Sequence, residues 1–333
     1  MARKPRTTKK VPEAAADLLA ALDFVKVAQQ DEGDARQTHC RIGGGVVAAN
    51  NGVISAAYPL ADDIDACPHT LNLRHALSKC GQTFKAVAGS GSLVVRSGDY
   101  RATVPCADPQ SLPDALPDPS CAIVDDRIKA SLLAVAPLAA EGSERVAFAA
   151  VLLRAGSAVA TNGRCVLEHW HGLDLPPGLV IPKASALAIA KVAAPLVGFG
   201  FSQNSATFHY EGGAWIKTQL YAEAYPDVGR VLDADTTPKK MQPKKMAEAW
   251  DAVSHFCTEF VFFRDGEMRS HWDHEAGASY AVKGLPDQSF NAKDFALVLP
   301  MIDTVDWQEY GKPAHFYGEN LRGAIIGMGQ RPA

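Results

Sequence analysis

The stretch Val159-Ala160-Thr161-Asn162-Gly163-Arg164 is an apolar strand that runs into an Asn-Gly turn, and Asn51-Gly52 repeats the turn 111 residues earlier. Asn and Gly both tolerate positive φ, so this dipeptide is typical of a tight turn between two strands. Three glycines, Gly45, Gly156 and Gly266, mark a second turn and are spaced by 111 and 110 residues. The sequence therefore predicts one unit repeated three times.

Each copy carries the same order of patterns. Strand, turn and strand are followed by a helical pattern at residues 71–77, 182–193 and 291–302, and then by alternating strands at 85–106, 197–220 and 314–328. A further helical pattern precedes each copy, at residues 13–27, 125–140 and 243–257. Two helices against an antiparallel sheet make each copy an α+β unit. Proline-rich and acidic linkers at 107–120 and 233–243 then give domains of 11–117, 118–235 and 236–333, after a basic tail of residues 1–10.

The composition is that of a soluble globular protein. Of 333 residues, 47% are hydrophobic and 21% are charged, and the length suits two or three domains. The apolar runs are shorter than the roughly 20 residues of a membrane span, and no signal-peptide pattern is visible. We expect a cytoplasmic protein with no membrane partner. Seven cysteines without a C-x-x-C pair predict buried free thiols.

The charge limits how the chain could contact nucleic acid. A net charge of -4 argues against a protein that grips DNA by neutralising many phosphates, but it allows one that encloses DNA and touches it weakly. Five basic residues fall in the first ten positions. Such a run is usually a solvated tail, with nucleic-acid contact as the alternative.

No motif for bond chemistry is present. His169-Trp170-His171 could place two imidazoles on one face of a strand, but His271-Trp272-Asp273-His274-Glu275 matches no metalloprotease pattern and neither cluster supplies a third ligand. The glycine runs lack the G-K-[ST] ending of a phosphate loop, and there is no G-x-S-x-G elbow. We expect no enzyme, no metal and no cofactor.

The motifs of the second copy resemble those of the bacterial DNA polymerase III beta sliding clamp family. Thr161-Asn162-Gly163-Arg164 is similar to the family's A-T-D-G-H-R turn, and Val180-Ile181-Pro182-Lys183 to its I-P-R/K-K helix start. Tyr225-Pro226-Asp227-Val228-Gly229-Arg230-Val231-Leu232 resembles Y-P-D-Y-x-R-V-L/I-P. Phe290-Asn291-Ala292-Lys293 and the terminal Gly323 to Met328 extend the likeness into the third copy.

The chain also departs from the family pattern. Asn162 replaces the usual Asp, Arg164-Cys165 replaces His-Arg, and Asp294 stands where an aromatic residue is common. At the C-terminus, Gly327-Met328-Gly329 replaces Pro-Met-Arg. This divergence and the basic tail suggest a phage or mobile-element member.

The resemblance implies a homodimeric ring of two chains, three domains each, joined head to tail around double-stranded DNA. Helices would line the pore and make weak contacts that ignore base sequence. The candidate pore residues are Arg74, Lys79, Arg127, Lys129, Lys183, Lys191, Lys244, Lys245 and Lys293. For each of them, a solvated helix face is the alternative interpretation.

The resemblance also implies a hydrophobic pocket between the second and third domains, which docks short peptides of DNA polymerase and clamp-loader subunits. Its expected wall is Phe148, Thr161, Gly163, Arg164, Cys165, Val166, Pro226, Arg230, Val231, Asn291, Ala324, Ile326 and Met328. The alternative for Phe148 and Val166 is a place in the domain core. The alternative for the whole chain is a clamp-fold binding protein that engages replication factors without forming a ring on DNA.

Overall fold

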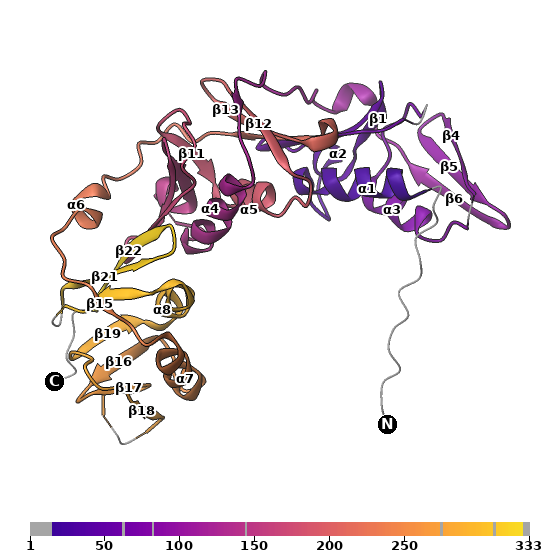
Figure 1. Ribbon diagram of the computed structural model, residues 1–333. Helices are drawn as coiled ribbons and strands as arrows, with labels where there is room; N and C mark the ends of the chain where they lie inside the picture. The colour runs from indigo at the N-terminus through magenta and orange to yellow at the C-terminus, as the bar shows by residue number, and fades with distance from the viewer. Residues whose placement is uncertain are drawn as a thin grey trace, which may run out of the picture. The chain divides into compact units, whose positions relative to one another are not determined.

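The computed structural model describes residues 15–61, 64–81, 83–143, 145–273, 276–308 and 311–328. The predicted basic tail, the start of the first helical pattern and His274-Glu275 lie outside these ranges. The chain divides into two compact units (Figure 1). Unit 1 runs up to Asp126 and adds Val192–Gln219, and unit 2 consists of Arg127–Lys191 and the chain from Leu220 onward.

The helices fall where the periodicity predicts them. The helices preceding the three copies are α1 (Ala16–Val25), α4 (Arg127–Val135) and α7 (Pro243–Ser254), and the helices inside them are α3 (Thr70–Leu77), α5 (Lys183–Ala190) and α8 (Ala292–Val298). Two single turns, α2 (Ala35–Thr38) and α6 (Gly229–Leu232), were not predicted. Pro243 occupies the first turn of α7, where its missing N–H has no intrahelical partner to lose.

Unit 1 contains two antiparallel sheets. The larger has the order β1-β2-β3-β14-β13-β12-β7, and the smaller is β4-β5-β6. Helix α1 packs on β2 and β3 and lies beside α3 (Figure 1). The strands are β1 (Arg41–Gly43), β2 (Val46–Asn50), β3 (Ile54–Pro59), β4 (Lys85–Gly89), β5 (Ser92–Ser97), β6 (Tyr100–Pro105), β7 (Ala122–Ile123), β12 (Leu196–Phe201), β13 (Ser205–Tyr210) and β14 (Trp215–Gln219).

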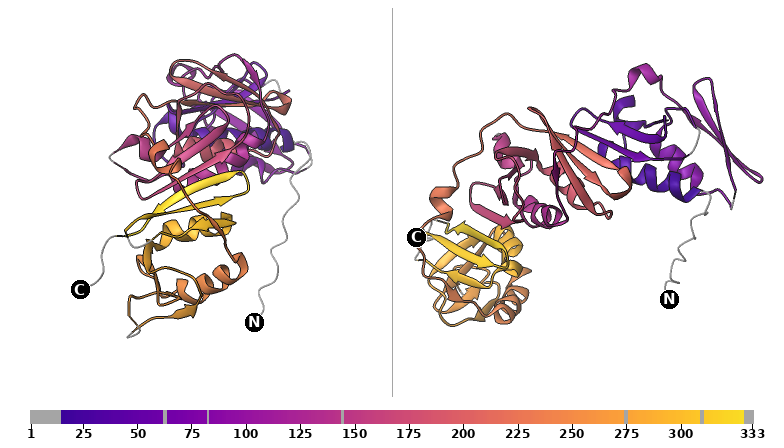
Figure 2. Two further views of the ribbon diagram at one scale, coloured as in Figure 1. Left: turned by 60° about the vertical axis from the view of Figure 1, so that its left-hand side comes forward. Right: turned by 45° about the horizontal axis from the view of Figure 1, so that its top comes forward.

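Unit 2 also contains two antiparallel sheets, with the orders β11-β8-β9-β10-β22-β21-β20-β15 and β18-β17-β16-β19. Helices α4 and α5 pack against each other, and both views of Figure 2 show α7 (orange) and α8 (gold) next to each other. The strands are β8 (Ala150–Leu153), β9 (Ser157–Thr161), β10 (Cys165–Trp170), β11 (Leu179–Pro182), β15 (Lys239–Lys240), β16 (Phe260–Arg264), β17 (Glu267–Arg269), β18 (Ser279–Ala281), β19 (Gln288–Asn291), β20 (Thr304–Asp306), β21 (Pro313–Gly318) and β22 (Leu321–Ile326).

The spacing of the three glycines corresponds to one turn used three times. Gly45, Gly156 and Gly266 lie in the first hairpin of each copy, with φ of 81°, 86° and 73°. An L side chain rarely adopts these angles, so glycine is the residue that fits. The α+β prediction and the repeat of helix, strands, helix and strands are confirmed.

The sheets join strands from neighbouring copies, which the local patterns did not predict. Strand β3 of the first copy pairs with β14 of the second, and β10 of the second pairs with β22 of the third. Each compact unit therefore contains parts of more than one copy. The domain limits 11–117, 118–235 and 236–333 stay a prediction.

All seven cysteines are free thiols, but they are not all buried. Cys40, Cys67, Cys80 and Cys165 are buried, Cys106 and Cys257 are half-buried, and Cys121 is exposed. The prediction of buried thiols is therefore wrong for Cys121, which precedes the edge strand β7. No helix in the described part of the chain is long and apolar enough to cross a membrane.

Candidate functional site

A cavity of about 230 Å³ in unit 2 lies where three segments meet. The segments are the β9–β10 turn, the stretch of chain around α6, and the end of β22. Val231 and Ile326 are 40% and 41% exposed, so apolar surface faces solvent at the mouth. The lining is Phe148, Thr161, Gly163, Arg164, Cys165, Val166, Pro226, Asp227, Val228, Val231, Pro313, Ala324 and Ile326.

The β9–β10 turn is held by its own side chains. The Asn162 Oδ1 accepts hydrogen bonds from the Arg164 N (3.0 Å) and the Cys165 N (2.9 Å), and the Thr161 Oγ1 donates to the Cys165 carbonyl at 2.7 Å. Gly163 has a φ of 85°, and a Cβ there would lie 3.2 Å from the Phe148 Cε2. Glycine thus allows both the turn and the close approach of the Phe148 ring that forms one wall.

Three residues that depart from the family pattern form one polar cluster beside this turn. The Asn162 Nδ2 donates to the Asp294 Oδ1 (2.8 Å), and the Arg164 Nε donates to the Asp294 Oδ2 (3.1 Å). The Asp294 carboxylate is nearly buried, with 8% of its side chain exposed. An aspartate at position 162 would place a second carboxylate against that of Asp294, and the two charges would repel each other. The amide of Asn162 is therefore the side chain that suits an acidic residue at position 294.

The stretch around α6 packs onto the sheet as the second wall. Val228 and Leu232 join Val159, Val166 and Ala324 in one apolar cluster, with Tyr225 packed against it. This packing fixes the backbone that presents Val231 to the cavity.

Two side chains of the third copy tie the same wall in place. The His315 Nε2 lies 3.0 Å from the Val231 carbonyl, to which it can donate. The Arg322 Nη1 donates to the Leu232 carbonyl at 3.2 Å, while its Nε donates to the buried Glu168 at 2.8 Å. Because the wall is tied at two successive carbonyls, the cavity is preformed.

The chemistry of the cavity is that of a binding surface. Burial raises the pKa of the Cys165 thiol, with the Asp294 charge adding to the effect, so this cysteine stays protonated and is a poor nucleophile. The other lining side chains are mostly apolar. A preformed apolar cavity with a polar rim suits an apolar side chain of an extended peptide.

Solved structures with the same arrangement are bacterial sliding clamps. A DNA polymerase sliding clamp from Bacillus subtilis superposes with a TM-score of 0.80 at 14% identity, over 96% of this chain and 98% of that one. A clamp from Pseudomonas aeruginosa gives 0.79 at 13% identity, over 95% and 98%. A Helicobacter pylori beta clamp bound to a DNA ligase peptide gives 0.77 at 16% identity, over 95% and 99%.

The chain has the fold of the bacterial sliding clamp. By sequence alone, no family model and no curated protein matches it. The sliding-clamp fold is therefore carried here by a strongly divergent sequence.

Most residues predicted for the pocket of this sliding-clamp fold line the unit 2 cavity, and three do not. Arg230 points away, with its guanidinium 3.5 Å from the Asp227 carboxylate at the exposed surface. Asn291 caps α8 by accepting from the Lys293 and Asp294 backbone N–H groups. Met328 lies against β19, where its backbone N donates to the Ser289 carbonyl.

Three lining residues were missed. Asp227 and Val228 lie inside the Tyr225-to-Leu232 motif, so the motif signalled the segment but not which side chains face inward. Pro313 starts β21, and no sequence signal marked it. For Val166, both interpretations hold, because it belongs to the apolar cluster and also lines the cavity.

The nine predicted pore residues lie on helices or directly after them. Arg74 is on α3 and pairs with Asp23 on α1. Lys183, on α5, donates to the Ala139 carbonyl at 2.7 Å and lies 3.2 Å from Glu141. The other seven are Lys79 after α3, Arg127 and Lys129 on α4, Lys191 at the end of α5, Lys244 and Lys245 on α7, and Lys293 on α8.

His169 and His171 lie in the described part of the chain, whereas His274 and Glu275 of the second cluster lie outside it. No group of three His, Cys, Asp or Glu side chains there could hold a metal ion. The His169 Nδ1 lies 2.8 Å from the Ser131 Oγ, and burial lowers the pKa of this imidazole. It acts as a structural contact between α4 and β10.

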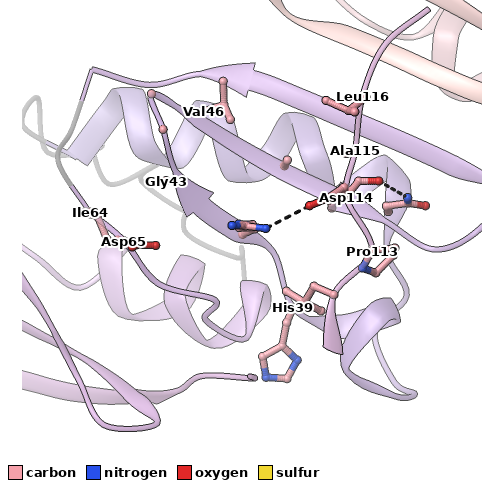
Figure 3. A pocket seen from close by; sticks show the side chains of 16 residues that line it. His39, Gly43, Val46, Ile64, Asp65, Pro113, Asp114, Ala115 and Leu116 are labelled. Atoms are coloured by element: carbon pink, nitrogen blue, oxygen red, sulfur yellow. Dashed lines mark hydrogen bonds and ion pairs between the residues drawn. The ribbon is translucent and has the colours of Figure 1, made fainter. Parts of the chain in front are cut away.

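A larger cavity of about 660 Å³ lies in unit 1, and none of the predicted site residues lines it. Figure 3 shows it between β1, β2 and the segment from Pro113 to Leu116. The Arg41 Nη1 pairs with the Asp114 Oδ1 at 3.2 Å, and the Asn50 Nδ2 donates to the Asp114 carbonyl at 3.1 Å. These two contacts hold the segment across the sheet.

Proposed function

We propose that the protein is a DNA sliding clamp. Two chains join head to tail into a closed ring around double-stranded DNA, and the unit 2 cavity tethers a DNA polymerase or a clamp loader by a short peptide. The role needs no bond chemistry and no cofactor, because DNA threaded through a closed ring cannot leave sideways.

The strand pairing at the two junctions between copies carries this proposal. At the first junction, β3 pairs antiparallel with β14, and at the second, β10 pairs antiparallel with β22. In both cases the third strand of one copy's first half meets the last strand of the next copy's second half. One junction rule thus applies twice within the chain.

The same rule leaves one edge free at each end of the series. Strand β18 is the third-copy equivalent of β3 and β10, and β6 is the first-copy equivalent of β14 and β22. Both are edge strands of their sheets. An unpaired edge is a template for another chain, so β6 of one chain would pair with β18 of a second chain and the reverse pair would close the ring.

The charge distribution supports a pore lined by helices. Helices α3, α4 and α5 contain no acidic residue, whereas α1, α7 and α8 do, and the whole chain carries a net charge of -4. Arg74 and Lys183 are engaged by neighbouring groups. Among the other candidates, Lys79, Lys191, Lys244 and Lys293 are exposed to solvent. A few exposed cations give weak, salt-dependent binding that permits sliding.

The cavity supports the tethering role. Its apolar floor and partly exposed rim suit a leucine or phenylalanine side chain of an extended peptide. A related clamp, from Helicobacter pylori, has been solved with a DNA ligase peptide. By analogy, a short peptide of a replication protein would occupy this cavity.

The mass in solution tests the ring. Light scattering after gel filtration is expected to give about 71 kDa, twice the 35.5 kDa of the chain, at micromolar concentration. A strict monomer would argue for the alternative, a clamp-fold protein that binds replication factors without a ring.

A proline on the free edge of β6 sharpens this test. The Pro105 carbonyl accepts from the His69 N, on the side away from β5, and residues alternate along a strand, so the Thr103 N–H faces the same free side. Thr103→Pro removes that donor without disturbing β5 and is expected to give monomers. Thr103→Val is the matched control and should stay dimeric, and a dimeric proline variant would exclude this edge as the interface.

A further inference from the structure

Unit 1 has a second cavity, of about 340 Å³, at the position that the repeat makes equivalent to the unit 2 cavity. Its turn is Asn51-Gly52, the counterpart of Asn162-Gly163. The Asn51 Oδ1 accepts from the Val53 N (3.0 Å) and the Ile54 N (2.9 Å), which is the bonding of Asn162 repeated. The two cavities are therefore built on one kind of turn.

The neighbouring strands correspond residue by residue. Ser55 pairs with Lys217 across β3 and β14, as Val166 pairs with Ala324 across β10 and β22. The Gln219 N donates to the Val53 carbonyl, as the Ile326 N donates to the Arg164 carbonyl. Lys217 and Gln219 thus stand where the unit 2 cavity has Ala324 and Ile326.

The third wall also has its counterpart. Pro113-Asp114 corresponds to Pro226-Asp227, and each pair lines its own cavity. Leu116, 72% exposed, is an apolar lining residue that follows this pair, and Val231 follows the other pair and lines the unit 2 cavity. Arg41 pairs with the Asp114 carboxylate and Asn50 donates to the Asp114 carbonyl (Figure 3), so the segment that carries Leu116 is held against the sheet.

The chemistry of this cavity differs from that of unit 2. Arg36 lines the unit 1 cavity on the side where Phe148 lines the unit 2 cavity. Lys217 and Gln219 make the wall formed by β14 polar. The Lys217 ammonium is matched by the Asp118 carboxylate at 3.1 Å. Arg36 is exposed, and its guanidinium forms no ion pair within the described part of the chain, so it is the cation left for a ligand.

We propose that the 340 Å³ cavity of unit 1 is a second peptide-docking site. It binds an extended peptide that carries an acidic side chain next to a leucine-sized apolar one. The carboxylate pairs with Arg36, and the apolar side chain packs between Leu116 and Val53, which is 47% exposed. The charge at the rim selects against basic peptides. This site goes beyond the proposed tethering pocket and does not depend on the ring.

Fluorescence anisotropy on the full chain tests the site with two labelled probes, acetyl-Ser-Asp-Leu-Ser-amide and acetyl-Ser-Lys-Leu-Ser-amide. Leu116→Asp removes the apolar contact in unit 1, and Val231→Asp is the matched change at an exposed apolar lining residue of the unit 2 cavity. Arg36→Glu reverses the charge. We expect the acidic probe to bind at least about tenfold more weakly to the Leu116 and Arg36 variants, and equally well to the Val231 variant.

The Arg36 variant should also lose the preference for the acidic probe over the basic one. Three results would overturn the proposal: no saturable binding of the acidic probe below about 1 mM, equal binding of both probes by the unaltered protein, or a loss caused by Val231→Asp but not by Leu116→Asp. The proposed tethering function of the unit 2 cavity has a separate test: a neutral apolar peptide should bind more weakly to the Val231 variant than to the unaltered protein.

Discussion

Replacing Asn162 by aspartate tests the polar contact that shapes the candidate pocket. The change is nearly isosteric, keeps the acceptor that holds the β9–β10 turn, and removes only the amide that donates to Asp294. The variant then has two carboxylates in contact, with Arg164 as the single cation between them. We expect the contact between β10 and α8 to be destabilised.

The magnitude follows from the geometry. The lost hydrogen bond is 2.8 Å long and ends on a charged, nearly buried acceptor, which corresponds to about 2 kcal/mol. Repulsion of the two carboxylates adds to this, and Arg164 offsets part of it, so we expect about 3 kcal/mol in all. Protonation of one carboxyl in acid removes the repulsion, so the loss should shrink as the pH falls.

Native-state hydrogen exchange, read on peptides of β10 and α8, measures the free energy of local opening. Asn51→Asp is the matched control, because Asn51 makes the same turn bonds without an acidic partner on its amide, and it should change stability by less than about 0.5 kcal/mol. The double variant Asn162→Asp with Asp294→Asn restores one donor and one acceptor and should recover most of the loss. Equal effects of the two Asn→Asp changes, or no recovery in the double variant, would show that the Asn162–Asp294 contact does not stabilise this region.

Three further outcomes follow. Gly163→Val should destabilise unit 2 by about 2 kcal/mol in thermal unfolding and weaken peptide binding, because the φ is positive and Phe148 is close; an unchanged melting temperature would contradict this. Lys129→Glu with Lys244→Glu should reduce the salt dependence of DNA binding measured by anisotropy, without altering the mass of the ring; an unchanged slope would remove these lysines from the pore. Burial raises the pKa of Asp118, but hydrogen bonds to its carboxylate outweigh this effect and hold the pKa below its usual value. The ionised Asp118 carboxylate therefore stabilises the fold above the unfolded-state pKa of about 3.9. This stabilisation is lost as the pH falls through the folded-state pKa. Asp118→Asn should therefore flatten the acid side of the stability profile of unit 1 in urea titrations, and an unchanged profile would count against this.

The sequence predicted the repeated unit well because its signals are local. Glycines with positive φ and the Asn-Gly turns depend on a few neighbouring residues, and they recur at one spacing. The joining of β3 to β14 and of β10 to β22 depends instead on edges that meet from far apart in the chain. No local pattern encodes such pairing, so it could not be read from the sequence.

The candidate pocket was predictable where a motif fixes the backbone, as at Thr161 and Gly163. It was less predictable where side-chain direction decides. Arg230 lies in the Tyr225-to-Leu232 motif, yet its turn of α6 directs the guanidinium to Asp227 at the surface. Pro313 reaches the cavity only because β21 pairs with the end of β22, where it stands opposite Ile326.

Encirclement of DNA by the protein is a topological property that can be measured directly. With a clamp loader and ATP present, labelled protein is loaded on a circular plasmid and on the same plasmid cut once, and both are passed through a sizing column at high salt. We expect retention on the circle and loss from the linear form, since only a free end lets a ring slide off. Equal retention on both forms, or retention on neither, would contradict it.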